Sequence, residues 1–283
     1  MKRFRVFNMD FDARVNTLIM DIKEDWKPEI KNQWEENQRS IEQGLIEEFG
    51  SSHFEIKRQN FVDLGDKPMS ILAFHNRFFQ QIRHAFVVGA YYPALTSACA
   101  LGERILNYLV LILREDYRGT DSYKHVYRKQ SFDDWDRAID TLESWDVLLP
   151  SVCEAFRNLK GSRNRAIHFR PEVDREDRAL ALEAIRSLRT IISDQFGGFG
   201  LAPWFIPNTP GETFIKRECE ELPFIKRVYL PNSLQVGPRH RITQMVPQIL
   251  VDDDFEYESR EVTDDEFRQL REDYKHESVQ VSD

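Results

Sequence analysis

The chain has 283 residues, of which 41% are hydrophobic, 12% aromatic and 31% charged. The 20 phenylalanines alone supply much of the apolar surface that a folded core needs, which argues against a wholly disordered chain. The formal net charge is -9, so the protein does not belong to the class of basic chains that bind nucleic acid over their whole surface. Any phosphate-binding site must therefore be local.

The sequence contains no segment typical of export or of a membrane. The N-terminal stretch MKRFRVFNMDFDARV lacks the apolar run of a secretory signal. The longest apolar run, residues 105–113, is far shorter than the roughly 20 residues that cross a bilayer. Cys99, Cys153 and Cys219 share no C-x-x-C spacing, which indicates neither a disulfide framework nor a zinc site. We expect a cytoplasmic protein that contacts no membrane and uses no metal and no cofactor.

The composition divides the chain into three segments, and the first covers residues 1–67. Arginine alternates with apolar residues over positions 3–6, which predicts a short strand. Apolar residues then recur at spacings of four and seven over positions 26–48, which predicts a helix with one narrow apolar face. Pro28 suits the first turn of this helix, and Gly50 suits its C-terminal cap.

The second segment, residues 68–197, has the pattern of an antiparallel bundle of helices with short connections. The helix expected from Pro93 to Arg114 is apolar nearly all round, which indicates burial on several sides. Its small residues, including Gly102, would let a neighbouring backbone approach closely. The other four helices are expected from Pro68 to Gly89, from Ser131 onward, from Pro150 to before Pro171, and from Asp174 to Phe196.

The third segment, residues 198–283, holds seven of the 12 prolines and so cannot continue the bundle. Short β-like runs are expected at residues 226–230, 241–246 and 255–262. Thr263 and Glu266 have the spacing of a capping box for a terminal helix. We interpret this segment as a small mixed α/β appendage, for which one arrangement is a sheet shared with the N-terminal strand. The predicted fold class is thus mainly α, a helical bundle with this appendage.

The most informative segment is residues 157–170, RNLKGSRNRAIHFR, a basic island in an acidic chain. It contains one histidine, five basic side chains and no acid. Such a local group of cationic donors suits a phosphate. The basic residues are Arg157, Lys160, Arg163, Arg165 and Arg170. We expect those without a role in catalysis to contact RNA.

The spacing within the island puts several of these groups together. Lys160, Asn164 and His168 are four residues apart, so they share one face of a helix, with an arginine on either side of Asn164. The alternative is a solvated helix face whose arginines pair with acids, such as those after Asp174.

Residues 163–168, RNRAIH, resemble the Arg-x4-His signature of the HEPN superfamily, the nucleotide-binding helical domains of higher eukaryotes and prokaryotes. That family carries the motif late in an antiparallel bundle, just before the last long helix, and the helix from Asp174 has this position. Residues 89–103 look like the family's earlier helix, in which a glycine-aromatic start leads into small residues and then an acid, here Glu103. The resemblance covers residues 68–197 and says nothing about either flank.

Many HEPN proteins are metal-independent endoribonucleases that dimerise so that two copies of the motif line one cleft. The resemblance implies that His168 assists proton transfer as an RNA 2'-hydroxyl attacks the adjacent phosphate. It likewise implies that Arg163 stabilises the pentacoordinate phosphate and that Asn164 orients these groups. Arg163 and His168 lie about 140° apart around an ideal helix, so one helix does not aim both at one atom. A homodimer would remove that difficulty.

The chain departs from the family pattern in two respects. Gly161 and Ser162 favour a helix break just before the motif, which would make Ser162 a cap and redirect Arg163. Some relatives have a tyrosine two residues after the histidine that a partner enzyme modifies, whereas this chain has Arg170. That form of regulation is therefore not implied.

Three hypotheses about function follow. The first is a homodimeric endoribonuclease of a toxin, stress or phage-defence system, which the resemblance implies. The second is a non-catalytic HEPN-like module for dimerisation or for binding RNA or nucleotides, with residues 198–283 binding a protein partner. The third is a structural component of a larger assembly.

Overall fold

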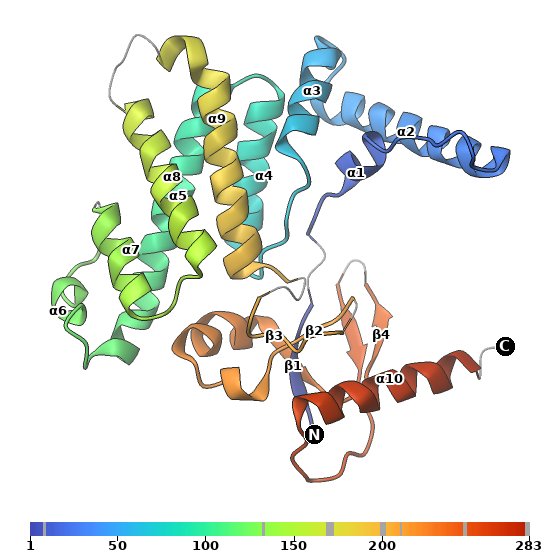
Figure 1. Cartoon of the computed structure of the whole chain (residues 1–283), viewed down its shortest axis with the longest axis vertical. Helices are drawn as coiled ribbons and strands as arrows, with labels where there is room; N and C mark the ends of the chain where they lie inside the picture. The colour runs from blue at the N-terminus through green and yellow to red at the C-terminus, as the bar shows by residue number, and fades with distance from the viewer. Residues whose placement is uncertain are drawn as a thin grey trace. The chain divides into compact units, whose positions relative to one another are not determined.

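The computed structural model describes residues 1–7, 10–131, 134–167, 173–198, 202–209, 211–245 and 248–280. The chain divides into two compact units (Figure 1). The helical unit is Asp10–Gln195, and the mixed unit combines Met1–Met9 with Phe196–Asp283. The described residues form many helices and only two small sheets, of three and two strands. The predicted fold class, mainly α with a small α/β appendage, is therefore confirmed.

The helical unit is built around α5, which contacts α4, α7, α8 and α9. These five helices are the predicted bundle. A short 3-10 turn, η1 (Arg114–Tyr117), follows α5, and a π turn, η2 (Ile191–Gln195), follows α9. The helices are α1 (Arg14–Leu18), α2 (Pro28–Phe49), α3 (Phe54–Leu64), α4 (Ala73–Val87), α5 (Tyr91–Leu113), α6 (Tyr123–Val126), α7 (Trp135–Ser144), α8 (Pro150–Ile167) and α9 (Val173–Thr190).

The apolar helix α5 is the centre of the core. Ala98, Ile105 and Leu109 on this helix are fully buried. Among the residues described, Tyr91–Tyr117 is the one helix long and apolar enough to span a membrane. In its apolar stretch of 18 residues, 50% is buried inside the protein. A Cβ atom on Gly102 would lie 2.4 Å from Leu159 Cδ2, so the glycine is what permits the close packing of α5 and α8.

Two helix starts differ from the sequence prediction. The helix expected from Pro68 begins at Ala73, because the Asn76 side chain bonds both the backbone N–H of Ser70 (2.9 Å) and its carbonyl (2.8 Å) and holds a non-helical turn there. The helix expected from Ser131 begins after Asp134, whose carboxylate accepts a hydrogen bond from a backbone N–H of the first turn.

Helix α3 was not predicted, because it is short and only weakly amphipathic. It contacts α2, α4 and α9. Arg178 of α9 forms an ion pair with Asp63 of α3, and Arg186 donates to the Asp63 carbonyl at 2.9 Å. These contacts join the N-terminal helices to the bundle as part of one unit.

The mixed unit has a three-stranded antiparallel sheet in the order β2-β1-β3. Here β1 (Arg3–Val6) lies between β2 (Thr213–Phe214) and β3 (Ser233–Val236), which confirms that the appendage shares a sheet with the N-terminal strand. A second sheet pairs β4 (Arg241–Gln244) with β5 (Leu250–Asp252). The remaining elements are η3 (Arg217–Cys219), η4 (Ile225–Tyr229), η5 (Leu230–Asn232) and α10 (Asp264–Gln280).

Two of the three strand predictions for the mixed unit are wrong. Residues 226–230 belong to helical turns, since Ile225, Val228 and Tyr229 are buried at helical spacing. Residues 255–262 form no strand, and the strand lies earlier, at β5. The run at 241–246 is confirmed as β4 for its first four residues. The predicted cap of α10 is also confirmed, because Thr263 Oγ1 accepts a 3.1 Å hydrogen bond from the Glu266 backbone N–H.

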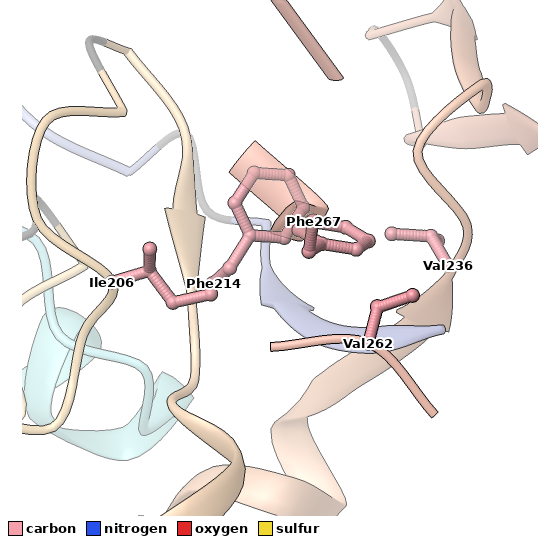
Figure 2. Packing of buried hydrophobic residues seen from close by; sticks show 5 residues of the cluster. All are labelled: Ile206, Phe214, Val236, Val262 and Phe267. Carbon is pink, nitrogen blue, oxygen red and sulfur yellow. The ribbon is translucent and has the colours of Figure 1, made fainter. Parts of the chain in front are cut away.

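An apolar cluster holds the mixed unit together (Figure 2). Phe214 of β2 and Phe267 of α10 make an edge-to-face contact with ring centroids 5.0 Å apart. Val236 of β3, Val262 and Ile206 complete the cluster. Strands, loops and the last helix thus share one small core.

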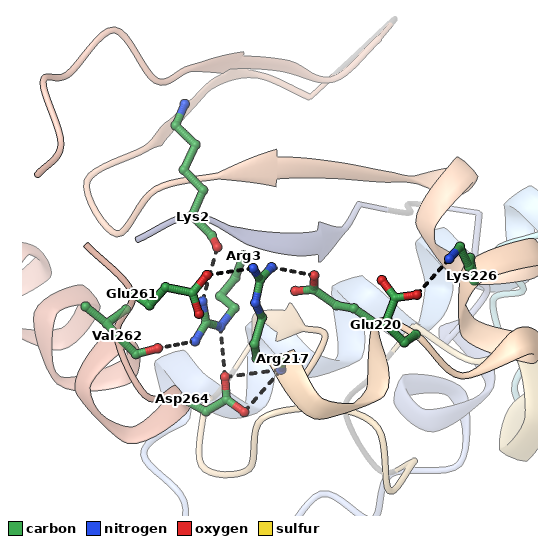
Figure 3. Close-up of polar contacts among 9 residues, drawn as sticks. Lys2, Arg3, Arg217, Glu220, Lys226, Glu261, Val262 and Asp264 are labelled. Atoms are coloured by element: carbon green, nitrogen blue, oxygen red, sulfur yellow. Dashed lines mark hydrogen bonds and ion pairs between the residues drawn. The ribbon is translucent and has the colours of Figure 1, made fainter. Parts of the chain in front are cut away.

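A polar cluster joins β1 to the start of α10 (Figure 3). The buried Arg3 donates from Nε to Asp264 Oδ1 at 2.8 Å and from Nη2 to the Val262 carbonyl at 2.5 Å. Arg217 donates to Glu220 at 2.7 Å and to Glu261 at 2.9 Å. A carboxylate in the first turn of α10 also stabilises the positive end of the helix dipole.

Candidate functional site

Helix α8 carries the described part of the basic island without a break. It runs from Pro150, which suits the first turn, to Ile167. The predicted break at Gly161 and Ser162 is wrong, because Ser162 is buried within the helix and its hydroxyl donates to the Asn158 carbonyl at 3.4 Å. Ser162 is therefore not a cap, and Arg163 projects from a regular helix.

Arg163 is held where three helices meet. Its Nη2 lies 3.3 Å from Glu103 Oε2 of α5, and its guanidinium carbon lies 5.9 Å from the ring centroid of Trp135, the first residue of α7. Trp135 Nε1 donates a 3.0 Å hydrogen bond to the same carboxylate oxygen. The Arg163 side chain keeps 28% of its surface exposed. It is thus oriented by the protein and still reachable by a ligand.

A cavity of about 630 Å³ opens beside this arginine. Its walls come from α4, α5 and α8, and they combine an apolar side with a charged rim. The volume lies within the range of small-molecule sites. The residues that line it include Phe78, Leu101, Glu103, Arg104, Arg163 and Ala166.

Cys99 also lines this cavity, but the thiol is not a nucleophile there. Burial raises the pKa of Cys99 to about 12, and the nearby Arg163 guanidinium opposes this shift only in part. The thiol is therefore protonated at neutral pH. Its contribution to the site is the shape of the wall.

Three other basic residues of the island form ion pairs with acids of neighbouring helices. Arg157 lies 2.6 Å from Glu143 Oε2, and Arg165 lies 2.6 Å from Glu183 Oε2. Lys160 pairs with Asp136. These contacts fit the alternative of a solvated face with ion pairs, and a role for Arg157, Lys160 and Arg165 in binding RNA stays a prediction.

Of the remaining predicted site residues, the structure describes only Asn164. Asn164 is exposed on α8 and is not among the residues that line the cavity. His168 and Arg170 lie outside the described residues. Of the motif, the structure therefore brings Arg163 and Ala166 to the cavity.

The structure adds residues that the sequence did not single out. Arg104 follows the acid of the resemblance directly, and its guanidinium lies 5.5 Å and 5.3 Å from the ring centroids of Phe74 and Phe78. Trp135 holds the Glu103 carboxylate. The only signal in the sequence that could have identified Arg104 is its position next to Glu103. The sequence has no signal for Trp135, because its role depends on how α5, α7 and α8 pack.

In comparisons with known proteins, no family model, no curated protein and no solved structure matches this chain. The HEPN resemblance rests on residues 89–103 and 163–168 and stays a prediction.

Proposed function

We propose that the protein is a metal-independent endoribonuclease that acts as a homodimer through Arg163, Asn164 and His168. The observation that carries the proposal is the position of Arg163, a partly exposed guanidinium oriented by Glu103 at the rim of a cavity. A cation held in advance at the place where charge develops stabilises a transition state without reorganisation. The role in toxin, stress or defence systems belongs to the same proposal.

The chemistry requires no more than positioned side chains. The RNA 2'-hydroxyl attacks the adjacent phosphorus and passes its proton to the His168 imidazole. The bond from phosphorus to the 5'-oxygen breaks, and that oxygen takes up a proton from solvent. Arg163 bonds the phosphate oxygens as negative charge grows on them. The products are a 2',3'-cyclic phosphate and a 5'-hydroxyl.

A second candidate function is a non-catalytic module that binds RNA or nucleotides. The observation in its favour is the same ion pair, since the Glu103 carboxylate compensates the charge of Arg163. On this alternative, RNA binds and is released uncut.

Incubation of the full-length protein with end-labelled single-stranded RNA in EDTA tests the proposal. We expect cleavage that leaves cyclic phosphate ends and that is abolished by Arg163→Ala and by His168→Ala. Arg118→Ala and His125→Ala serve as matched controls, because both side chains are exposed and distant in sequence from the motif. RNA that is bound but never cut would support the second candidate, and cleavage that survives in both motif variants would contradict the first.

A further inference from the structure

The cavity beside Arg163 has an apolar wall, which contributes nothing to the binding or cleavage of a phosphate. Phe78 of α4 and Leu101 of α5 face it, and Ala166 of α8 closes one side. Apolar and aromatic walls are the usual surroundings of a flat organic ring, because they remove both of its faces from water. The wall therefore points to a ligand that has a ring as well as a phosphate.

Arg104 stands at the rim of this wall in an arrangement suited to an anion. Its side chain is exposed, and within the described part of the chain it makes no ion pair and no hydrogen bond. The guanidinium instead lies close to the rings of Phe74 and Phe78. Such contacts restrain the arginine while leaving N–H groups available for bidentate bonds to a phosphate.

The charge of the rim has the sign that a phosphate needs. Arg104 and Arg163 contribute two positive charges, and Glu103 contributes one negative charge. The rim is thus positive by one charge in a protein whose net charge is -9. A local field of this kind concentrates anions at one place.

Polar groups on the same wall are available to read a base edge. Gln81 and Ser97 line the cavity and are exposed, and neither side chain forms a hydrogen bond with any residue that the structure describes. An amide and a hydroxyl supply both donors and acceptors. Hydrogen bonds to base edges are how proteins distinguish the bases of single-stranded RNA.

We infer that this cavity is a nucleotide subsite, in which the base of one RNA nucleotide lies against Phe78 and Leu101 while Arg104 binds its phosphate. The inference rests on the proposed function, because that nucleotide is the one next to the cleaved phosphate at Arg163. Arg104 then binds the substrate through its phosphate, Gln81 and Ser97 select the base, and Arg163 acts in the chemistry.

The test uses the full-length protein and the four ribonucleoside 3'-monophosphates as probes, with affinity measured by calorimetry. We expect one or two of them to bind in preference to the others. Arg104→Gln is expected to weaken that binding about tenfold, as the loss of a charge-assisted contact does. Ala100→Trp, which extends a bulky ring from an exposed position of the cavity wall, should block binding without a change in the core.

Arg128→Gln is the matched control, since Arg128 also lies over an aromatic ring, that of Tyr127 at 4.9 Å, but outside the cavity. Nucleotide binding unaffected by both Arg104→Gln and Ala100→Trp would overturn the subsite, even if RNA is cut. A change in oligomeric state in place of a change in affinity would also overturn it and assign the cavity to a second copy of the chain. Binding that depends on Arg104 in a protein that cuts no RNA would support the subsite and refute the nuclease.

Discussion

Glu103 Oε2 accepts a 3.0 Å hydrogen bond from Trp135 Nε1 and lies 3.3 Å from Arg163 Nη2. One carboxylate oxygen of α5 therefore orients an indole of α7 and a guanidinium of α8. These three helices are fixed to one another at Arg163, a residue proposed to act in the chemistry. Substitution of Glu103 is therefore a direct test of the candidate site.

Replacing Glu103 by Gln should separate RNA binding from RNA cleavage. The amide still accepts from Trp135, but the negative charge at the rim is lost and Arg163 is no longer held by an ion pair. We expect tighter RNA binding, because repulsion of phosphate disappears, together with a lower kcat, because the guanidinium is less well positioned. The free energy of unfolding should change by less than about 1 kcal/mol, since the pair is partly exposed.

Single-turnover cleavage and RNA titrations measure these effects. Glu42→Gln is the control, because it removes the acid of another partly exposed arginine–glutamate pair, that with Arg58, which does not line the cavity. An increase in both KM and kcat for Glu103→Gln would contradict the prediction.

Mixing two inactive variants should restore activity if each site takes groups from both subunits. In a heterodimer of Arg163→Ala and His168→Ala subunits, one composite site keeps both residues and the other loses both. With free exchange of subunits in an isologous dimer, we expect about one quarter of the wild-type activity. Cleavage assays after co-incubation, with native mass spectrometry to count heterodimers, provide the measurement. Heterodimers without activity would show that each subunit carries a complete site.

Gly102→Ala should destabilise the helical unit, whereas Gly44→Ala should stabilise it. The new methyl group at position 102 would lie 2.4 Å from Leu159 and 3.0 Å from Trp135, and Leu159 is fully buried. We expect a loss of about 1–3 kcal/mol from overpacking. Gly44 lies in α2 with nothing within 4 Å of its added methyl group, so alanine should gain about 0.5–1 kcal/mol in helix preference. Urea unfolding followed by circular dichroism measures both, and changes of equal sign would contradict the packing argument.

Two buried histidines should make the protein less stable as the solution becomes acidic. Burial lowers the pKa of His75 to about 3 and that of His240 to about 4, the latter with help from the nearby Arg271. Below about pH 6.5 the unfolded chain binds protons that the folded chain does not, so the free energy of unfolding falls as the pH falls. Each histidine contributes about 1.4 kcal/mol per pH unit until its folded pKa is reached.

The contribution of His240 can be isolated with His240→Gln. Its Nδ1 lies 2.7 Å from the Gly237 carbonyl, and glutamine keeps a donor there while it removes the titrating group. We expect a smaller dependence of stability on pH between 7 and 5, measured by urea unfolding. The exposed His125→Gln provides the reference. Equal slopes for the two variants would argue against a neutral buried imidazole.

The three cysteines should differ in their rates of alkylation. Cys99 is 5% exposed and Cys153 is 2% exposed, whereas Cys219 is partly exposed. Burial raises the pKa of each thiol, and for Cys99 to about 12, so the reactive thiolate is scarcest there. With iodoacetamide at pH 8 we expect Cys219 to react first, as read by peptide mass spectrometry. All three should react alike in urea, and native Cys99 reacting as fast as Cys219 would disagree with the structure.

Much of the fold was predictable because helical spacing records which face of each helix is buried. The bundle around α5 follows from its apolar surface, and the close approach at Gly102 follows from the absence of a side chain. Helix α3 and the turns at residues 225–232 were not predictable, because short segments contain too few repeats to separate a helix from a strand. The start of α4 depended on a side chain, Asn76, that binds the backbone six residues earlier.

Only the part of the candidate site that lies within one sequence segment, the basic island, was predictable. The basic island identified Arg163, but the spacing could not show that Arg157, Lys160 and Arg165 each meet an acid on another helix. The contact of Arg104 with two rings of α4 joins positions about 30 residues apart, a relation that periodicity within one helix does not contain.

The central position of β1 has a consequence for synthesis on the ribosome. Val6 pairs with Thr213 and Ser233, so β1 leaves the exit tunnel long before either of the strands that it pairs with. The helical unit, which lies between them in the sequence, completes its own contacts during that delay. The nascent chain therefore carries an unpaired strand while the helical unit is synthesised, and a chaperone that occupies β1 during this time would delay closure of the smaller unit without affecting the larger one.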